Sequence, residues 1–408
     1  MLNRSLKITP AALGVAVLGL SVSTLASAQP LADSISQAID GGDVALNLRY
    51  RHEYVDQDGK PKDANASTLR SRITLKSGVV GGFMGLVEVD NVSYVGGDNF
   101  NNTENGKTNY PVVADPDYTE VNQAFISYAF DDKNKATLGR QRINHSGQRF
   151  LGGVGWRQNE QTFDAATFTL SPLDGLTVDY SYIWDVNRIF GPEGSDADFE
   201  GDSHALIATY KIADGHTISG FSYLLDLDEA PALSSSTYGL EYKGGFNVSD
   251  GVSLGVNLSY AEQSDYKDSG LDYDAGYYFA ELAVKTKPVT VALGYEVLES
   301  DNGVGFKTPL ATLHKFQGFA DKFLVTPPGG IEDTYLKVAT KIAGVKLIAF
   351  YHDFEAETGG MDYGSEFDFI AAYKFGKNYS VLFKYAAYEA DDYSNDTDKA
   401  WLMVTAAF

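Results

Sequence analysis

The chain ends with the ten residues KAWLMVTAAF, Lys399 to Phe408, and this stretch decides the fold. Every second residue counted back from the end is apolar: Phe408, Ala406, Val404, Leu402 and Ala400. The positions between them are mixed. Alternation with a period of two indicates a β-strand. About ten residues with an apolar outer face is the length that a tilted strand needs to cross a bilayer, so the pattern predicts a membrane-spanning strand.

The same alternation recurs along the chain. In residues 44–54, for example, Val44, Leu46 and Leu48 share one face, and Asn47 and Arg49 share the other. Similar segments lie at residues 68–76, 176–184, 252–260, 289–297, 345–351, 367–375 and 379–387. We count about eighteen such segments, which is an even number within the range of outer-membrane barrels.

The connections between these segments alternate between short and long. Short turns are predicted near Gly78 and Gly344 and at residues 131–134, 172–174, 213–215, 244–250, 287–288 and 376–378. Longer polar spans are predicted at residues 56–66, 95–118, 144–155, 189–202, 226–235, 263–276, 300–332, 355–364 and 389–398. Short periplasmic turns alternating with long external loops are typical of an outer-membrane barrel.

A soluble β-sandwich or solenoid is the alternative fold. Such a fold would bury its apolar face, whereas this chain places aromatic side chains on the apolar face near strand ends, as membrane interfaces require. The sequence therefore predicts an all-β, transmembrane antiparallel β-barrel of about 18 strands. The barrel should form a single domain over residues 43–408, with short periplasmic turns and long extracellular loops.

The first 28 residues have the pattern of a secretory signal peptide. Arg4 and Lys7 precede an apolar run at residues 11–20, and Ala26-Ser27-Ala28 is a small-residue cleavage site. A transmembrane anchor is the alternative, but the apolar run is too short to span a bilayer comfortably. We expect cleavage after Ala28 and a periplasmic lead-in at residues 29–42, with a turn of helix from Leu31 to Ile39.

The outward aromatic side chain predicted for Phe408 resembles the assembly signal of bacterial outer-membrane barrels. This resemblance implies a location in the outer membrane of a Gram-negative bacterium. The expected partners are outer-membrane lipid and the barrel assembly machinery, the latter through the C-terminal strand.

Composition excludes several other classes of protein. The chain has no cysteine, so it contains neither disulfides nor thiolate metal sites. Its net charge of -23 disfavours a nucleic-acid partner, because phosphates would be repelled. The mean hydropathy of -0.20 is compatible with a barrel, because alternating strands average to a value near zero.

Most arginines of the mature chain lie in pairs spaced two residues apart, and none follows Arg188. This spacing places both side chains of a pair on one face of a strand. That face should be the lumen, because an arginine facing lipid near the bilayer centre costs about 2–4 kcal/mol. The predicted lumen and selectivity residues are Arg49, Arg51, Arg70, Arg72, Arg140, Arg142 and Arg157, with Glu88 and Asp90. They could form a basic strip or pair with lumen acids, and the two interpretations are compatible.

The second half of the chain carries lysines and acids instead of arginines, so we expect a mixed lumen wall there. These residues are Lys243, Lys285, Lys337, Lys346, Lys374, Lys384, Glu241, Glu281, Glu296, Glu366 and Asp368. The span from Ser300 to Glu332 is too long for a plain connection. Its apolar residues have helix-like spacing, and the span could constrict the barrel mouth or simply cap it.

No catalytic residue, metal site or cofactor is predicted. His145-Ser146, His314 and His352-Asp353 contain parts of a nucleophile and base set, but no recognisable motif surrounds them. Residues 196–201 begin like a calcium loop, but the twelfth position is Ile207, where a bidentate glutamate is required. We therefore expect a protein that is not an enzyme.

Four blocks of sequence resemble the alginate export family of outer-membrane porins, in particular its broad branch. They are GRQRINHSGQRFLGGVGWRQNEQTF (139–163), NYPVVADP (109–116), TEVNQAFISY (119–128) and TPLATLHKFQGFADKFL (308–324). The resemblance implies an eighteen-stranded barrel whose lumen carries arginines and acids and passes an anionic polysaccharide outward. It also implies that the predicted arginines line the conduit.

The sequence thus predicts an outer-membrane porin that forms a passive diffusion channel for anionic or polar solutes, among them an anionic polysaccharide. Three alternatives remain open. They are a barrel hydrolase, a small-solute uptake porin unrelated to alginate, and a structural or adhesive barrel with a blocked lumen.

Overall fold

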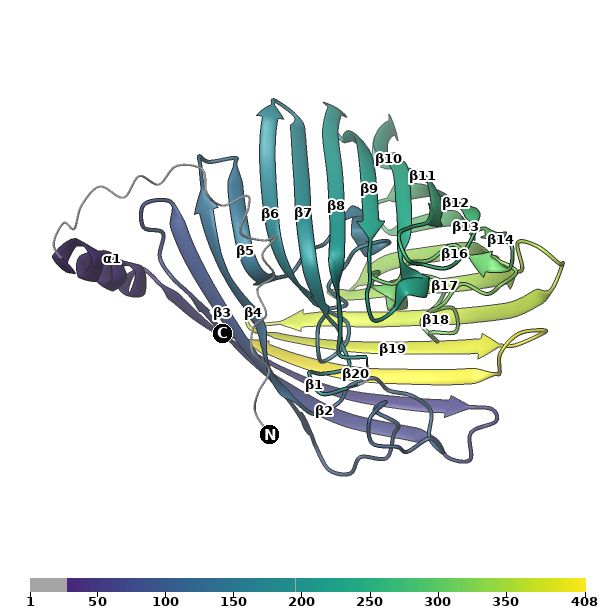
Figure 1. Cartoon of the computed structure of the whole chain (residues 1–408). Coiled ribbons are helices and arrows are strands. Elements are labelled where there is room, and N and C mark those ends of the chain that lie inside the picture. Colours follow the sequence, from purple (N-terminus) through teal and green to yellow (C-terminus); the bar gives the residue numbers. More distant parts are fainter. Residues whose placement is uncertain (1–27, 195) are drawn as a thin grey trace.

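The computed structural model describes residues 28–194 and 196–408. The predicted signal peptide lies outside these residues, apart from Ala28, where helix α1 (Ala28–Asp40) begins. Eighteen described strands form one antiparallel sheet, and the pairing of its last strand with its first closes the sheet into a barrel (Figure 1). This confirms the predicted fold and number of strands.

The strands run in chain order around the barrel, each paired with its sequence neighbour. They are β1 (Asp43–Gln57), β2 (Ala64–Lys76), β3 (Phe83–Tyr94), β4 (Thr119–Ala129), β5 (Lys135–Gln141), β6 (Thr162–Leu173), β7 (Leu176–Asn187), β8 (Asp198–Ala213), β9 (His216–Leu225), β10 (Ser235–Ser249), β11 (Val252–Asp265), β12 (Asp274–Thr286), β13 (Val289–Leu298), β16 (Ile331–Ile342), β17 (Val345–Glu355), β18 (Asp362–Phe375), β19 (Tyr379–Glu389) and β20 (Thr397–Ala407). Two further strands, β14 (Ser300–Asp301) and β15 (Val304–Gly305), form a small separate hairpin.

Tight turns close one end of the barrel, as the sequence predicts. Ile342 pairs with Val345, which leaves only Ala343 and Gly344 to reverse the chain between β16 and β17. Both have positive φ, 50° and 86°, as this kind of two-residue hairpin turn requires. The C-terminus and α1 lie at this end (Figure 1), where Gly78 N donates to Ala38 O at 2.7 Å.

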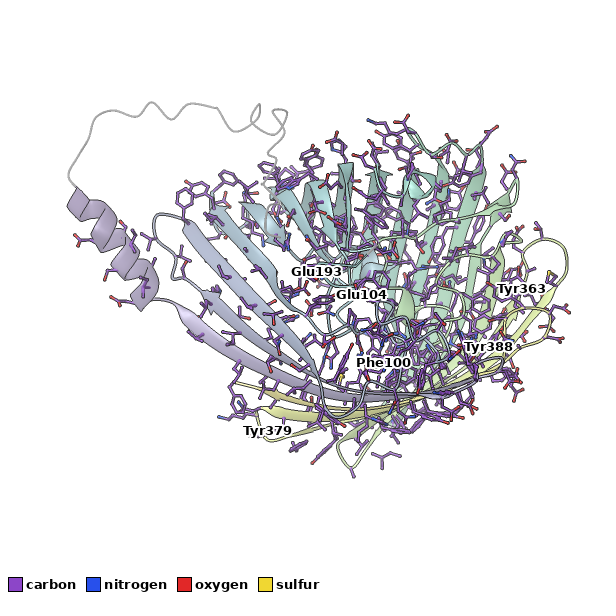
Figure 2. All side chains as sticks on the ribbon, turned by 60° about the horizontal axis from the view of Figure 1, so that its bottom comes forward. Phe100, Glu104, Glu193, Tyr363, Tyr379 and Tyr388 are labelled. Atoms are coloured by element: carbon purple, nitrogen blue, oxygen red, sulfur yellow. The ribbon has the colours of Figure 1, made fainter. Side chains whose placement is uncertain are left out.

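The last strand has the predicted outer face. Leu402, Val404 and Phe408 are 44%, 38% and 58% exposed, whereas Trp401 points inward and is 1% exposed. These exposed apolar side chains would contact water if the barrel stood alone. In a bilayer, lipid covers them. Side chains project from both faces of the wall in Figure 2. No helix in the described part of the chain is long and apolar enough to cross a membrane.

The long loops leave the other end of the barrel. We number them in chain order; L3 is residues 142–161, between β5 and β6, and L7 is residues 299–330, between β13 and β16. The helix-like spacing of the apolar residues in L7 does not produce an α-helix, because its only described helical turn is the 3-10 turn Leu313–Lys315. Positive φ at Gln317, Gly318 and Asp321 reverses the chain repeatedly and prevents a longer helix.

Candidate functional site

Loops L3 and L7 meet inside the barrel and together form what we call the partition. Gly152 N donates to Leu310 O at 2.9 Å, and Thr312 N donates to Gln148 O at 3.0 Å. The hydroxyl of Thr312 also donates to Gln148 Oε1 at 2.6 Å. Segments about 160 residues apart in the chain are therefore joined by their main chains.

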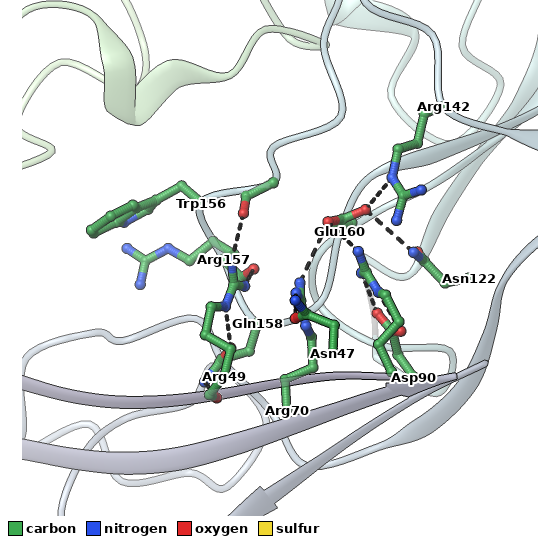
Figure 3. A network of polar contacts seen from close by, with 12 residues as sticks. Asn47, Arg49, Arg70, Asp90, Asn122, Arg142, Trp156, Arg157, Gln158 and Glu160 are labelled. Atoms are coloured by element: carbon green, nitrogen blue, oxygen red, sulfur yellow. Dashed lines mark hydrogen bonds and ion pairs between the residues drawn. The ribbon is translucent and has the colours of Figure 1, made fainter. Parts of the chain in front are cut away.

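On one side, the arginines of β1 fasten the partition to the barrel wall (Figure 3). Arg49 Nε donates to Gln158 Oε1 at 2.9 Å, and its Nη1 donates to Gly155 O at 2.9 Å. Arg51 Nη1 contacts Asp115 at 3.0 Å, and its Nη2 donates to Trp156 O. These arginines therefore hydrogen-bond to main-chain carbonyls of L3. Both are buried, with Arg49 7% and Arg51 1% exposed.

Glu160 of L3 binds three arginines from different elements. Its carboxylate lies 2.8 Å from Arg72, 2.5 Å from Arg142 and 3.4 Å from Arg70 (Figure 3). Burial disfavours the charged form of Glu160, but Arg72 and Arg142 outweigh it and hold the pKa of Glu160 well below its usual range. The carboxylate is therefore ionised at neutral pH, and it joins L3 to β2 and to the end of β5.

Asp321 plays the matching part in L7. Its carboxylate lies 2.6 Å from His314 Nδ1, 2.8 Å from Lys399 Nζ and 3.2 Å from Arg157 Nη2. Burial again opposes the charge, yet His314, Lys399 and Arg157 keep the pKa of Asp321 well below the usual range. Asp321 thus connects L7 both to L3 and to β20.

An aromatic stack completes the join between the loops. The Trp156 ring of L3 lies parallel to the His314 ring of L7, with 4.4 Å between their centroids. Arg51 and Lys384 each place a cation 4.4 Å from the Trp156 centroid. Lys384 Nζ also lies 2.7 Å from His314 Nε2, and since His314 Nδ1 faces a carboxylate, a neutral ring with the proton on Nδ1 satisfies both contacts.

The partition is also anchored to strands β13 and β18. Arg149 of L3 contacts Glu296 of β13 at 2.7 Å, and Gln317 of L7 donates to the same carboxylate. Glu366 of β18 accepts the main-chain N–H groups of Phe319 and Ala320 at 2.5 and 2.7 Å. Strands β1, β2 and β13 therefore hold L3, whereas β13, β18, β19 and β20 hold L7.

The predicted lumen residues all lie on the inner side, but in two environments. Seven of them are buried: Arg49, Arg51, Arg70, Arg72, Arg157, Glu88 and Asp90. Arg140 and Arg142 keep 29% of their side chains exposed. Arg140 contacts Asp164 at 2.8 Å, and Arg142 contacts Glu160 and Glu88. Most of the expected basic strip is thus paired with acids.

Sequence reasoning missed several members of the network. Asp115, Glu160 and Asp321 lie in irregular loops, where no alternation marks them as inward-facing. Arg149 has no partner two residues away, so the pair spacing did not select it. A usable signal for Asp115, Trp156 and Glu160 was their position inside the blocks that resemble the porin family.

A cavity of about 860 Å³ lies on the outer side of the partition. Residues from L1, L2, L4, L5 and L9 line it together with both loops of the partition. Its charged and titratable lining residues are Lys60, Arg157, Arg188, Lys307, His314, Asp321, Lys322 and Lys399. Cations therefore far outnumber acids at this mouth of the barrel. Among residues 28–194 and 196–408, no group of three or more His, Cys, Asp or Glu side chains could hold a metal ion.

Comparison with known proteins supports these findings. The family model described as alginate export matches residues 42–223. The fold is similar to OccK3 (OpdO) of Pseudomonas aeruginosa, with a TM-score of 0.71 and 14% identity over 93% of this chain and 98% of that one. OccK9 (OpdG) of the same species has a TM-score of 0.71 and 17% identity over 91% and 99%. OccAB4 of Acinetobacter baumannii has a TM-score of 0.69 and 14% identity over 90% and 98%.

None of the curated proteins compared with the chain matches it. The family match begins just before β1 and ends in β9, so it covers the half of the barrel that supplies the arginines and all of L3. The structural matches extend the likeness to the rest of the closed barrel. The chain is therefore an 18-stranded antiparallel β-barrel of the outer-membrane porin fold, with the sequence pattern of the alginate export family over residues 42–223.

Proposed function

We propose that the protein is a passive diffusion channel in the bacterial outer membrane and that it admits small anionic or polar solutes. The observation that carries this proposal is the cation-rich cavity at the outer mouth, directly above the partition. Clustered cations at a pore entrance raise the local concentration of anions and lower the barrier to their entry. The partition then restricts the size of what can pass.

Export of an anionic polysaccharide is the second candidate, and the family match over residues 42–223 favours it. The attachment of the partition to strands from both halves of the barrel favours small solutes instead. A polymer would have to displace L3 or L7, whose ion pairs at Glu160 and Asp321 are buried and numerous.

A barrel hydrolase is less well supported. Such an enzyme would need a histidine within about 3 Å of a nucleophile. In the described part of the chain, His314 contacts Asp321 and Lys384, and His352 contacts Asp333. His204 and His216 contact the hydroxyls of Tyr180 and Tyr242. These contacts are explained by packing of the barrel wall and of the partition.

For assembly, we propose that the barrel assembly machinery recognises the C-terminal strand with its outward Phe408. The exposed apolar face of β20 up to this residue supports the idea. Outer-membrane lipid would cover the same face in the assembled barrel.

We expect the double variant Arg140→Ala, Arg142→Ala to shift the channel toward cations. The variant removes the two predicted lumen arginines whose side chains remain partly exposed. Asp164 and Glu88 then lose these partners, so the charge of the lumen becomes more negative. The measurement is the reversal potential of the refolded channel in a planar bilayer across a potassium chloride gradient. Lys133→Ala is the control, because Lys133 lies at an exposed periplasmic turn. A reversal potential equal to that of the control would contradict the assignment.

A further inference from the structure

We propose that helix α1 lies in the periplasmic surface of the outer membrane and that its apolar face, which contains Ile35 and Ile39, contacts zwitterionic phospholipid. The helix directly precedes β1 at the end of the barrel where the tight turns lie (Figure 1). The inference goes beyond the proposed function, because it holds whether or not the barrel conducts.

The barrel leaves the apolar face of α1 uncovered. Ile35 and Ile39 lie four residues apart, so they share one face of the helix, and they are 53% and 72% exposed. Ser34 and Ala38 share the neighbouring face and are only partly exposed. Because Gly78 N donates to Ala38 O, this neighbouring face is the one turned toward the barrel rim. The helix itself projects away from the wall beyond the start of β1 (Figures 1 and 2).

Close packing of glycines fixes the end of α1 against the rim. Gly42 N donates to Ile39 O at 3.0 Å, which ends the helix. A Cβ atom at Gly42 would lie 2.7 Å from Lys76 O, and one at Gly78 would lie 3.0 Å from the main chain of Gly41. A larger side chain at either position would push the helix away from the turn between β2 and β3. The uncovered face therefore belongs to a helix that is held in place at the rim.

The lipid-facing surface of the barrel continues onto this helix. Val44 and Leu46 on the outer side of β1 are exposed, and so is Val79, which follows Gly78 in the turn beside the helix. Lipid covers such apolar side chains on a barrel in the membrane. An amphipathic helix next to this band can bury its own apolar face at the boundary between headgroups and acyl chains. The position of Ile39, five residues before Val44, makes lipid the occupant that the surface favours.

Charge indicates which lipid fits. The helix carries Asp33 and Asp40 but neither lysine nor arginine, and Asp43 follows it at the start of β1. Helices that bind anionic lipid carry basic residues on their polar face, whereas these carboxylates would be repelled. Headgroups without net charge, such as phosphatidylethanolamine, are therefore the expected partners. Because β1 tethers the helix to the membrane surface, a few aliphatic side chains suffice to hold it there.

The test attaches a fluorophore at a single cysteine, which the natural chain lacks. Ile35→Cys places the fluorophore on the apolar face, and Gln37→Cys places it on the opposite face, where Gln37 is exposed. The barrel with α1 attached is refolded into vesicles of phosphatidylethanolamine and phosphatidylcholine with brominated acyl chains. We expect quenching by bromine to be about threefold or more stronger at position 35 than at position 37. Heat-modified migration on gels verifies that each variant is a folded barrel.

A matched pair of charged variants tests the same face with the fluorophore kept at Ile35→Cys. Ile39→Glu adds a carboxylate to the apolar face, one turn along the helix, and Gln37→Glu adds the same charge to the opposite face. Burial of an unpaired carboxylate among acyl chains is costly, so Ile39→Glu should reduce the quenching by about half or more. Gln37→Glu should leave the quenching unchanged. Replacing part of the lipid with phosphatidylglycerol should reduce the quenching in the protein without either glutamate.

Equal quenching at positions 35 and 37 would overturn the proposal. Weak quenching at both positions, with excimers of pyrene attached at Ile35→Cys that increase with the ratio of protein to lipid, would assign the face to a second copy of the chain. Weak quenching without excimers would place the face in water. Strong quenching at position 35 that Ile39→Glu leaves unchanged would also contradict the assignment of the apolar face.

Discussion

Replacing the inward part of L7, residues 309–325, with a short glycine-serine linker should raise the single-channel conductance about threefold or more. This segment supplies Leu310, His314 and Asp321, through which L7 contacts L3 and the barrel wall. The strands do not depend on it, because β13 and β16 pair directly along ten residues. Its removal should therefore widen the lumen without opening the sheet.

The control for this experiment is a change of similar kind in a loop outside the lumen. Gly359 and Gly360 of L8 are exposed, so inserting a short glycine-serine linker between them should leave conductance unchanged. Planar-bilayer recordings of both variants give the comparison. If trimming L7 leaves the conductance at the wild-type value, the partition is not the constriction of the channel.

Glu160→Gln should have the second large effect, on both stability and selectivity. The substitution keeps the size of the side chain but removes the charge that Arg70, Arg72 and Arg142 share. Removing one partner from a buried ion pair typically costs about 3–5 kcal/mol, because the remaining charge stays buried without compensation. We expect the free energy of unfolding to fall accordingly and the channel to become more selective for anions.

The same residue has a defined pH dependence. Since the pKa of Glu160 is held below that of an unfolded glutamate, its stabilisation is fully present at neutral pH. That stabilisation is lost only as the pH falls through the depressed pKa, so acid should reduce the difference between wild type and variant. The measurements are urea unfolding in lipid vesicles and reversal potentials, with Asp174→Asn at an exposed turn as the control. Unchanged stability and selectivity would show that L3 is held by other contacts.

Much of the barrel could be predicted from sequence because its rules are local. Alternation in β20 gave the outer face of Leu402 and Val404, since lipid accepts only apolar side chains there. Turn residues such as Gly344 predicted the tight turns at one end of the barrel, because hairpin geometry alone requires their positive φ. Each of these signals lies within a few neighbouring residues.

The partition could not be predicted in this way, because its contacts are non-local. The bonds from Gly152 to Leu310 and from Arg157 to Asp321 join loops with no periodic pattern. Whether the arginines are exposed to the lumen or buried in ion pairs depends on these contacts. Spacing placed Arg70 and Arg72 in the lumen, but only the position of Glu160 in space shows that they are buried and neutralised and do not line open water. Local rules could not predict that L7 enters the lumen either, because its contacts with Glu296 of β13 and Glu366 of β18 are non-local.

Single-channel recording of the refolded wild-type protein in a planar bilayer, across a salt gradient, tests whether this barrel is a channel with a cation-rich outer mouth. We expect discrete open steps and a reversal potential that indicates preference for anions. The absence of conductance steps from protein that migrates as a folded barrel would contradict it.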